Sequence, residues 1–475
     1  MENKIYIDKR PLPILFFIEY RKAFIFTGLF ILFIKLLTSE LPENLPPEGW
    51  KALCSFIFCI LLWVTDVIPR AITGIIAIVL IPTLGILPKE LSYSLFGNQT
   101  IFFILGAFMI AVAYSKSGLS KRMAIFVLRS IATTPVKLLL SILLFSAFLS
   151  LWMPEHAVAA ILFPVVLDFN NYITTSNKKK FSQGMFFALI WGCCIGGVGT
   201  FLGGARNPLA VGLLEETTGT TISFLDWMIA IIPFVFVNLM FASLYLTIFF
   251  KDDFDLTLIQ QKLLEKRKWI GNITIKEYMV GIVILLTILS WITLGDKVGI
   301  TNIALLSAIL LFVLNLVSWE EASSNIHWDI LLMYGGALSL GSALDKTGAI
   351  SWICQNYFSN LNYEPILIVF IFTLLSIFLT EVISNAAVVL LLLPIALNIA
   401  ISNDINPIII TFCVAVPSGL AFMLPIGNPP NAICFSSKTY TTMDSIKTGL
   451  VMNFISIALF MITVIIYWPL IGLKL

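Results

Sequence analysis

The sequence predicts an all-α polytopic membrane protein with about 11 transmembrane helices and two re-entrant hairpins, arranged as two inverted-topology repeats. Three observations support this fold class. The composition is far too apolar for a soluble protein, long apolar stretches recur along the whole chain, and interruptions of these stretches fall at matching places in two halves of the sequence.

Hydrophobic residues make up 59% of the 475 residues and charged residues only 12%. Soluble domains contain about 45–50% apolar and about 25% charged residues, and a single soluble core stops growing near roughly 250–300 residues. A helix crosses the ~30 Å of bilayer hydrocarbon with about 20 apolar residues. Stretches of this kind include Trp227–Phe250, Tyr278–Leu294, Ile300–Val317 and Met452–Leu470.

The N-terminal region predicts the orientation of the chain. The first apolar run, Ala23 to Leu37, starts late and lacks a small-residue cleavage site, so we interpret it as a retained first span and not as a signal peptide. Basic residues precede this run and the short loop after it is acidic. By the positive-inside rule we expect a multi-pass protein of the plasma membrane with a cytoplasmic N-terminus.

Several functional classes are disfavoured by composition and by missing motifs. The seven cysteines show no zinc-ligand spacing, and most of them lie in apolar runs, as buried small residues do. A net charge of only +2 predicts no nucleic-acid partner. The motifs of zinc proteases, serine hydrolases and P-loop ATPases are missing, so we predict that the protein is not an enzyme and holds no resident cofactor.

A polar stretch at 251–276 divides the chain, and its basic cluster should be cytoplasmic. Six spans are then expected before it and five after it, which places the C-terminus outside. The predicted organisation is an N-terminal segment with the first span (1–50), a first repeat (51–250), a cytoplasmic linker (251–276) and a second repeat (277–475).

The two halves also resemble each other in sequence. One set of matched positions is Gly106, Lys116 and Gly118 in the first half and Gly336, Lys346 and Gly348 in the second. Another match relates Gly203–Asn207 to Gly427–Asn431. Five spans per half is an odd number, so the repeats should lie in the membrane with opposite orientation, as in many secondary transporters.

Each half contains one predicted re-entrant hairpin and one predicted broken helix. The hairpins lie at about 136–168 and 365–402, and the broken helices at about 185–214 and 407–438. An unwound backbone in lipid leaves amides and carbonyls unpaired at a cost of several kcal/mol each, unless protein, water or ligand satisfies them. These breaks therefore predict a central binding site, although plain kinks or surface loops are the alternative interpretation.

Three segments resemble motifs of the divalent anion/sodium symporter family, whose members carry dicarboxylates, citrate or sulfate. They are Thr65 to Thr73, Thr380 to Asn385, and Gly427 to Asn431. The resemblance extends over nearly the whole chain after the first span. It implies a homodimer in which a scaffold domain holds the dimer and a transport domain moves like an elevator, carrying substrate between the hairpin tips and the broken helices.

The resemblance also implies which residues form the site. The substrate-binding positions would be Glu155, His156, Ala157, Gly204, Arg206, Asn207, Ser384, Asn385, Ala386, Asn428, Pro429, Pro430 and Asn431. A second sodium site would use Thr380, Ile383, Asn385 and Gly427. The expected partners are a small anion, the lipid bilayer and a second copy of the chain, and sodium is the one possible bound ion.

The first half departs from the family pattern. Pro154-Glu155-His156 stands where the family has Ser-Asn-Thr, and Arg206 lies in the segment that replaces the first Thr-Pro-Pro-Asn break. Ser150 is placed like Thr380 of the second half, whereas Ala386 lacks the hydroxyl that the family often has there. Two sodium-coordinating side chains are therefore replaced by ionisable groups.

We hypothesise that Arg206, oriented by Glu155, replaces the first sodium ion or contacts substrate directly, because a guanidinium binds carboxylates in a two-pronged geometry. A histidine side chain ordinarily titrates near neutral pH, so we expect that His156 could permit proton coupling. Other interpretations stay open: Arg206 snorkelling to an interface, a purely structural Glu155–Arg206 ion pair, His156 bonded to backbone, and Asn207, Asn385 and Asn431 as helix caps.

The expected function is secondary active transport of small divalent anions, foremost C4-dicarboxylates, by an elevator mechanism and as a sodium-independent exchanger. The alternatives are a sulfate, arsenite or other inorganic-anion carrier, or a sodium- or proton-coupled symporter of the same superfamily. A channel is disfavoured because paired hairpins and broken helices favour alternating access.

Overall fold

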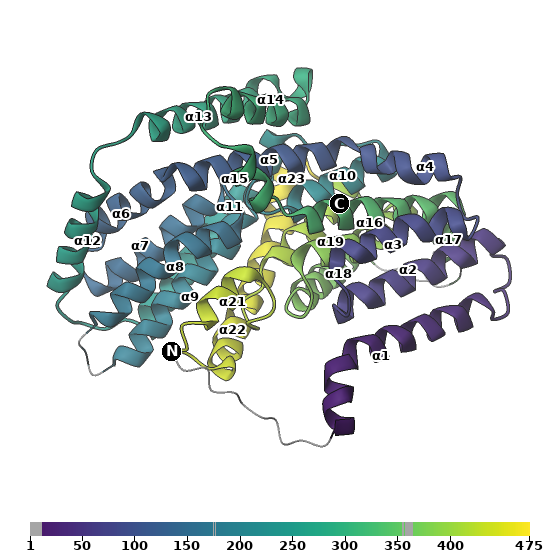
Figure 1. Cartoon of the computed structure of the whole chain (residues 1–475), viewed down its shortest axis with the longest axis horizontal. Coiled ribbons are helices and arrows are strands. Elements are labelled where there is room, and N and C mark those ends of the chain that lie inside the picture. Colours follow the sequence, from purple (N-terminus) through teal and green to yellow (C-terminus); the bar gives the residue numbers. More distant parts are fainter. Residues whose placement is uncertain (1–11, 174, 176, 354–355, 357–363) are drawn as a thin grey trace. The chain divides into compact units, whose positions relative to one another are not determined.

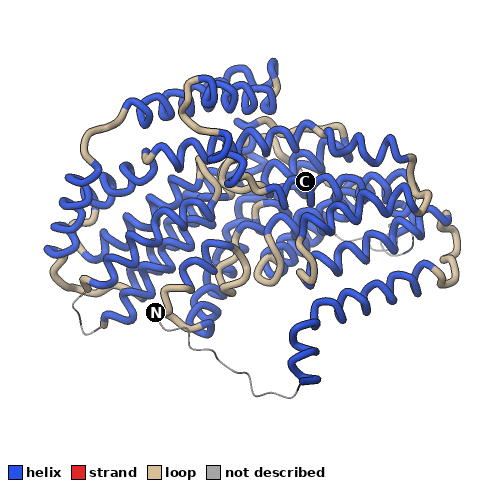
Figure 2. The backbone as a smooth tube through the Cα atoms, viewed as in Figure 1, coloured by secondary structure: helices blue, strands red, loops and turns tan. Residues whose placement is uncertain are grey.

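A computed structural model describes residues 12–173, 175, 177–353, 356 and 364–475 of the chain. In these residues the regular structure is helical throughout and contains no strand (Figure 2). The predicted all-α class is therefore confirmed. The six cysteines that fall in the described segments are buried and unpaired, as expected for small apolar residues, whereas Cys354 lies outside them.

Six helical stretches in the described residues are long and apolar enough to cross a membrane, and five shorter apolar helices accompany them. The long ones are α2 (Pro47–Thr65), α4 with α5 (Lys89–Ser94 and Gln99–Ser117), α11 (Phe224–Phe249), α13 (Ile275–Val298), α19 (Asn385–Ser402) and α22 with α23 (Thr442–Ile462 and Trp468–Leu470). The shorter ones are α3 (Arg70–Thr83), α7 (Pro135–Ser150), α14 (Ile300–Val313), α18 (Pro365–Leu379) and α20 (Pro407–Ala415) with its following turn. The chain is thus a multi-pass helical membrane protein.

The remaining helices are shorter or more polar. They are α1 (Leu12–Leu37), α6 (Leu119–Ile131), α8 (Glu155–Asn171), α9 (Lys178–Gly197), α10 (Arg206–Thr218), α12 (Thr257–Ile270), α15 (Trp319–Asn325), α16 (Trp328–Lys346), α17 (Ala349–Ile353) and α21 (Pro429–Phe435). Helix α1 contains the predicted first span, and α12 lies inside the predicted polar linker.

The chain folds into two compact units, and each draws on both halves of the sequence. The smaller unit consists of residues 1–96 and 332–352. In it α2 packs on α1 and α3, with Phe58 at the centre of an apolar cluster. Helices α3 and α16 touch at Gly74 and Gly336, where a Cβ atom on either glycine would collide with the backbone of the other helix. Small residues at a crossing allow this close approach.

The larger unit consists of residues 97–331 and 353–475 and contains both predicted hairpins and both broken helices. Helices α7 and α8 form the first hairpin, and α9 runs beside them (Figure 1). A Cβ atom on Gly192 or Gly196 of α9 would collide with α7, so the two helices are in backbone contact. Helices α18 and α19 form the second hairpin, and both contact α20.

The backbone is interrupted in two places of the larger unit. The first break separates α9 from α10, over residues 198–205. The second follows the short turn Pro417–Gly419 and ends where Pro429 begins α21. Glycine and proline are concentrated at both breaks, which explains why the helical hydrogen-bond ladder stops there.

Candidate functional site

The candidate site forms where the two hairpin tips meet inside the larger unit. Glu155 is the first residue of α8 and Asn385 is the first residue of α19. The Asn385 side-chain amide donates a hydrogen bond of 2.8 Å to Oε1 of Glu155. The structure therefore joins two residues that are separated by 230 positions in the sequence.

Arg206 completes this cluster from the start of α10. Its Nη1 atom lies 3.2 Å from Oε2 of Glu155, and the Arg206 side chain is only 2% exposed. The guanidinium lies in a cradle of glycines, because a Cβ atom on Gly204 or Gly419 would collide with it. An arginine that snorkels to an interface keeps its charged head in water, so this degree of burial contradicts that interpretation.

The charges of this ion pair cancel within the cluster. The pair contributes no net positive charge to an approaching anion, unlike a bound sodium ion. However, Nε and Nη2 of Arg206 are buried without a hydrogen-bond partner among the described residues. A guanidinium carries five donors, so part of the hydrogen-bonding capacity of Arg206 is unused while Glu155 holds it in place.

An oxygen cluster lies on the other side of Asn385. The hydroxyl Oγ1 of Thr380 is 2.8 Å from Oδ1 of Asn385 and 2.6 Å from the carbonyl oxygen of Ser418. One hydroxyl hydrogen cannot serve both acceptors at once, so three oxygens meet with a single hydrogen between them. Hard cations take oxygen ligands, so these three oxygens are the groups that a cation at this position would use.

Two of the four residues predicted for the second cation site, Thr380 and Asn385, are therefore brought together. Ile383 belongs to the same tip and is buried. Gly427 lies against Glu381. The carbonyl of Ser418 is an addition that sequence reasoning missed, although the interruption at Pro417–Gly419 was a visible signal for an exposed carbonyl.

The two predicted asparagines of the broken helices, Asn207 and Asn431, each donate hydrogen bonds to two backbone carbonyls; we call each such pair of bonds a clamp. Asn207 donates to the carbonyls of Gly197 and Thr200, at 3.0 and 2.6 Å. Asn431 donates to the carbonyls of Ala421 and Leu424, both at 3.0 Å. In both cases the acceptors lie ten and seven residues before the asparagine. These bonds pair carbonyls that the breaks leave open.

The other predicted residues of the second half shape the helix starts. Asn428 is the N-cap of α21 and accepts from the N–H of Asn431, while its amide reaches Sγ of Cys194 at 2.9 Å. Pro429 and Pro430 occupy the first turn of α21. The remaining two, Ser384 and Ala386, flank Asn385, and the Ser384 hydroxyl caps α19 by accepting from the N–H of Ala387.

His156 and Ala157 follow Glu155 in the first turn of α8, where both are half-buried. His156 does not join the Arg206 cluster. Its Nε2 atom lies 2.9 Å from Nε2 of His327, which precedes α16. The two histidines of the chain are thus hydrogen-bonded to each other, and His156 does not rely on backbone for a partner.

Glu381 is a further functional candidate that sequence reasoning missed. Its buried carboxylate accepts hydrogen bonds from the N–H groups of Phe422, Met423 and Leu424 at 2.8–3.1 Å. The Asn453 amide donates to it as well, at 2.8 Å. A charged residue in an apolar hairpin was visible in the sequence, but the unwound backbone that binds it lies some 40 residues further on.

Comparisons with known proteins agree with this architecture. The sequence profile of the family described as "Sodium:sulfate symporter transmembrane region" matches residues 21–474. The chain is 28% identical over 467 residues to the sodium-dependent dicarboxylate transporter SdcS of Staphylococcus saprophyticus, covering 92% of this chain and 90% of that protein. It is 31% identical over 469 residues to SdcS of Staphylococcus aureus strain bovine RF122, covering 92% and 89%.

Two solved structures share the fold at low sequence identity. MtrF of Neisseria gonorrhoeae, described among antimetabolite efflux pumps, aligns with a TM-score of 0.56 and 12% identity over 96% of this chain and 95% of its own. The YdaH transporter of Alcanivorax borkumensis aligns with a TM-score of 0.53 and 13% identity over 81% and 89%. The profile match over nearly the whole chain shows that this protein belongs to the sodium:sulfate symporter family of membrane transporters and is not an enzyme.

Proposed function

We propose that the protein is a secondary transporter of C4-dicarboxylates in which Arg206 takes the place of one sodium ion. The relatives named as sodium-dependent dicarboxylate transporters support the substrate class. The observation that carries the proposal is the buried chain from Arg206 through Glu155 to Asn385, which joins the first helix break to both hairpin tips. In this arrangement a fixed guanidinium stands where the family pattern predicts a cation.

Substrate would bind to the unpaired donors of Arg206 and to the amide of Asn385. A carboxylate fits the planar fork of a guanidinium through two parallel hydrogen bonds. The Asn385 amide carries two N–H donors, so it could donate one hydrogen bond to the substrate while it keeps its bond to Oε1 of Glu155. Glu155 would remain the partner of Nη1 of Arg206, so the buried ion pair would stay intact while substrate is bound.

Movement of the site across the membrane would follow an elevator mechanism, carried out by a homodimer with cytoplasmic N-termini. The proposal rests on the family resemblance and on the matched hairpin and broken helix of each half. A rigid-body movement of one set of packed helices against the other would expose the site to each side of the membrane in turn.

A second candidate is symport coupled to one sodium ion, and the oxygen cluster of Thr380, Asn385 and Ser418 favours it. Under this candidate the first sodium is replaced by Arg206 and the second is retained. The two candidates share the substrate and differ only in whether sodium is required.

Uptake of radiolabelled succinate into proteoliposomes tests both candidates, with an inward sodium gradient or with potassium in its place. Exchange predicts uptake that depends on internal succinate and not on sodium. Single-sodium symport predicts sodium stimulation with a Hill coefficient near one. Strict sodium dependence with more than one ion per substrate would contradict the replacement by Arg206, and lack of saturable succinate uptake under all conditions would contradict the substrate class.

A further inference from the structure

Helices α6 and α12 lie side by side in the larger unit (Figure 1). A cavity of about 790 Å³ is lined by both helices and by the residues that follow α12. This cavity is remote in sequence from the hairpin tips. Four basic residues line it: Arg122 and Arg129 on α6, and Arg267 and Lys268 near the end of α12. Apolar side chains, among them Phe126 and Leu264, form the rest of its wall.

The cavity carries more basic than acidic side chains without a partner. The acidic residues nearby already have partners: Glu277 binds Arg122 at 2.9 Å, Asp168 binds Lys266 at 2.7 Å, and Glu265 binds Lys262 at 2.6 Å. Among the residues that the structure describes, no acidic side chain pairs with Arg129, Arg267 or Lys268. The cavity thus presents three uncompensated positive charges to whatever fills it.

The surroundings of the cavity have the character of a membrane interface. Phe126 is 66% exposed and Trp269 is 84% exposed. Directly after this region the apolar helix α13 begins at Ile275, which is also 84% exposed. Tryptophan is enriched where helices leave the hydrocarbon, so an exposed tryptophan beside the start of an apolar helix is consistent with an interfacial position.

The rim of the cavity is held rigidly. Arg122 of α6 forms a two-pronged ion pair with Glu277 of α13. The same guanidinium donates to the carbonyls of Gly271 and Asn272, at 2.7 and 2.8 Å. These bonds tie α6, the end of α12 and the start of α13 together. A ligand therefore meets a preformed site and loses little free energy to ordering it.

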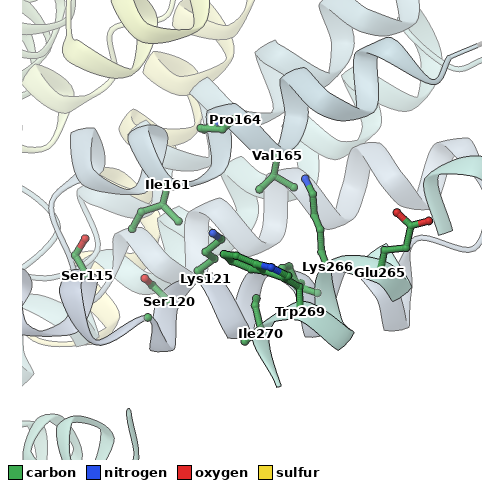
Figure 3. A pocket seen from close by; sticks show the side chains of 12 residues that line it. Ser115, Ser120, Lys121, Ile161, Pro164, Val165, Glu265, Lys266, Trp269 and Ile270 are labelled. Carbon is green, nitrogen blue, oxygen red and sulfur yellow. The ribbon is translucent and has the colours of Figure 1, made fainter. Parts of the chain in front are cut away.

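A second cavity, of about 660 Å³, lies next to the first and shares Ile125 and Ile270 with it. Figure 3 shows Trp269 lying between Lys121 and Lys266, with Pro164 and Val165 of α8 on the facing side. Lys121 lies over the indole ring, 5.7 Å from its centroid. The two cavities together offer both a basic pocket and a continuous apolar wall.

We propose that the α6–α12 cavity binds an anionic phospholipid from the surrounding leaflet. The phosphate group would lie among Arg129, Arg267 and Lys268, and an acyl chain would follow Phe126 and the apolar wall. Basic pockets between helices on the cytoplasmic side are typical binding sites of anionic headgroups. A soluble anion would gain nothing from the apolar wall, and a zwitterionic lipid would leave the positive charges uncompensated.

Native mass spectrometry of the full-length protein in mild detergent tests the proposal, with phosphatidylglycerol and phosphatidylcholine as the probes. We expect a preference for phosphatidylglycerol, which the triple variant R129Q/R267Q/K268Q lowers by about tenfold. The matched control K178Q/K179Q/K180Q removes the same charge from exposed lysines at the start of α9 and should keep the preference.

Three further outcomes decide the proposal. The charge-conserving variant R129K/R267K should retain most of the preference, which separates loss of charge from misfolding. Phe126→Ser should weaken binding of the lipid, and millimolar glycerol 3-phosphate should fail to displace it. Three results would contradict the proposed lipid site. They are equal binding of both lipids by the wild type, an equal loss of preference in the matched control, and full displacement of the lipid by glycerol 3-phosphate.

Discussion

The two broken helices of the chain are closed by the same pair of hydrogen bonds, whereas the hairpin tips of the two halves carry different chemistry. Asn207 and Asn431 each bind carbonyls ten and seven residues earlier. At the tips, Asn385 takes part in an oxygen cluster, while its counterpart Glu155 forms an ion pair. The hydrogen bonds that shape the backbone are thus duplicated, and the groups at the hairpin tips have diverged.

The same contrast extends to the hydroxyls that precede the tips. Thr380 contacts two oxygens of the second half, whereas the hydroxyl of Ser150 is buried with no hydrogen-bond partner in the described structure. This difference accompanies the change at the tip, where the Glu155–Arg206 ion pair of the first half is the counterpart of the oxygen cluster of the second half.

The largest expected effect comes from breaking the ion pair of the first half. Arg206→Gln leaves the Glu155 carboxylate buried without a counter-charge, which costs about 3–5 kcal/mol. We expect thermal unfolding at much lower temperature and loss of succinate uptake. The double variant E155Q/R206Q should recover part of the stability, and Arg129→Gln at the α6–α12 cavity should keep normal uptake. Equal stability of Arg206→Gln and the wild type would show that the ion pair does not stabilise the protein.

The second comparison concerns the two hydroxyls. Thr380→Val removes one oxygen of the cluster and should raise the sodium concentration for half-maximal uptake by about tenfold, if uptake is sodium-stimulated. Ser150→Ala is the matched control, and it should leave the sodium response unchanged because this hydroxyl has no partner. A larger effect at Ser150 than at Thr380 would reverse our assignment of the retained cation site.

The third comparison concerns the clamps. Asn207→Ala and Asn431→Ala each remove two buried hydrogen bonds to backbone carbonyls, and each should lower the free energy of unfolding by about 1–3 kcal/mol. Because the two asparagines bind carbonyls at the same spacing along the chain, the two losses should be similar when measured by thermal or denaturant unfolding in detergent. A loss at only one clamp would show that the repeats are not equivalent in stability.

The smallest expected effect concerns His156 and His327. Their mutual hydrogen bond predicts that His156→Asn and His327→Asn each destabilise the protein by about 1 kcal/mol. The double variant should lose little more than either single variant, because both changes remove one shared interaction. Additive losses would mean that the rings act independently. If either single variant shifts the pH profile of uptake, the histidine pair also takes part in coupling protons to transport.

The sequence predicted those features that depend on local pattern. Apolar length indicated the membrane-spanning class, and the interruptions around Pro154, Gly204 and Pro417 indicated where the helical ladder would stop. It also predicted that Glu155 would orient Arg206, because an unpaired charge is costly in an apolar environment. The predicted boundaries of the repeats remain predictions, since the compact units of the fold combine elements of both halves.

Other parts of the site depended on contacts between distant segments. The bonds from Asn385 to Glu155, from His156 to His327 and from Glu381 to the unwound backbone join positions 230, 171 and about 40 residues apart. Hydrogen-bond donors and acceptors find their partners only after helices with no shared local pattern have packed. The sequence by itself therefore determined which residues were chemically unusual, and the tertiary structure decided which of them meet, because directional bonds depend on position in space and not on spacing along the chain.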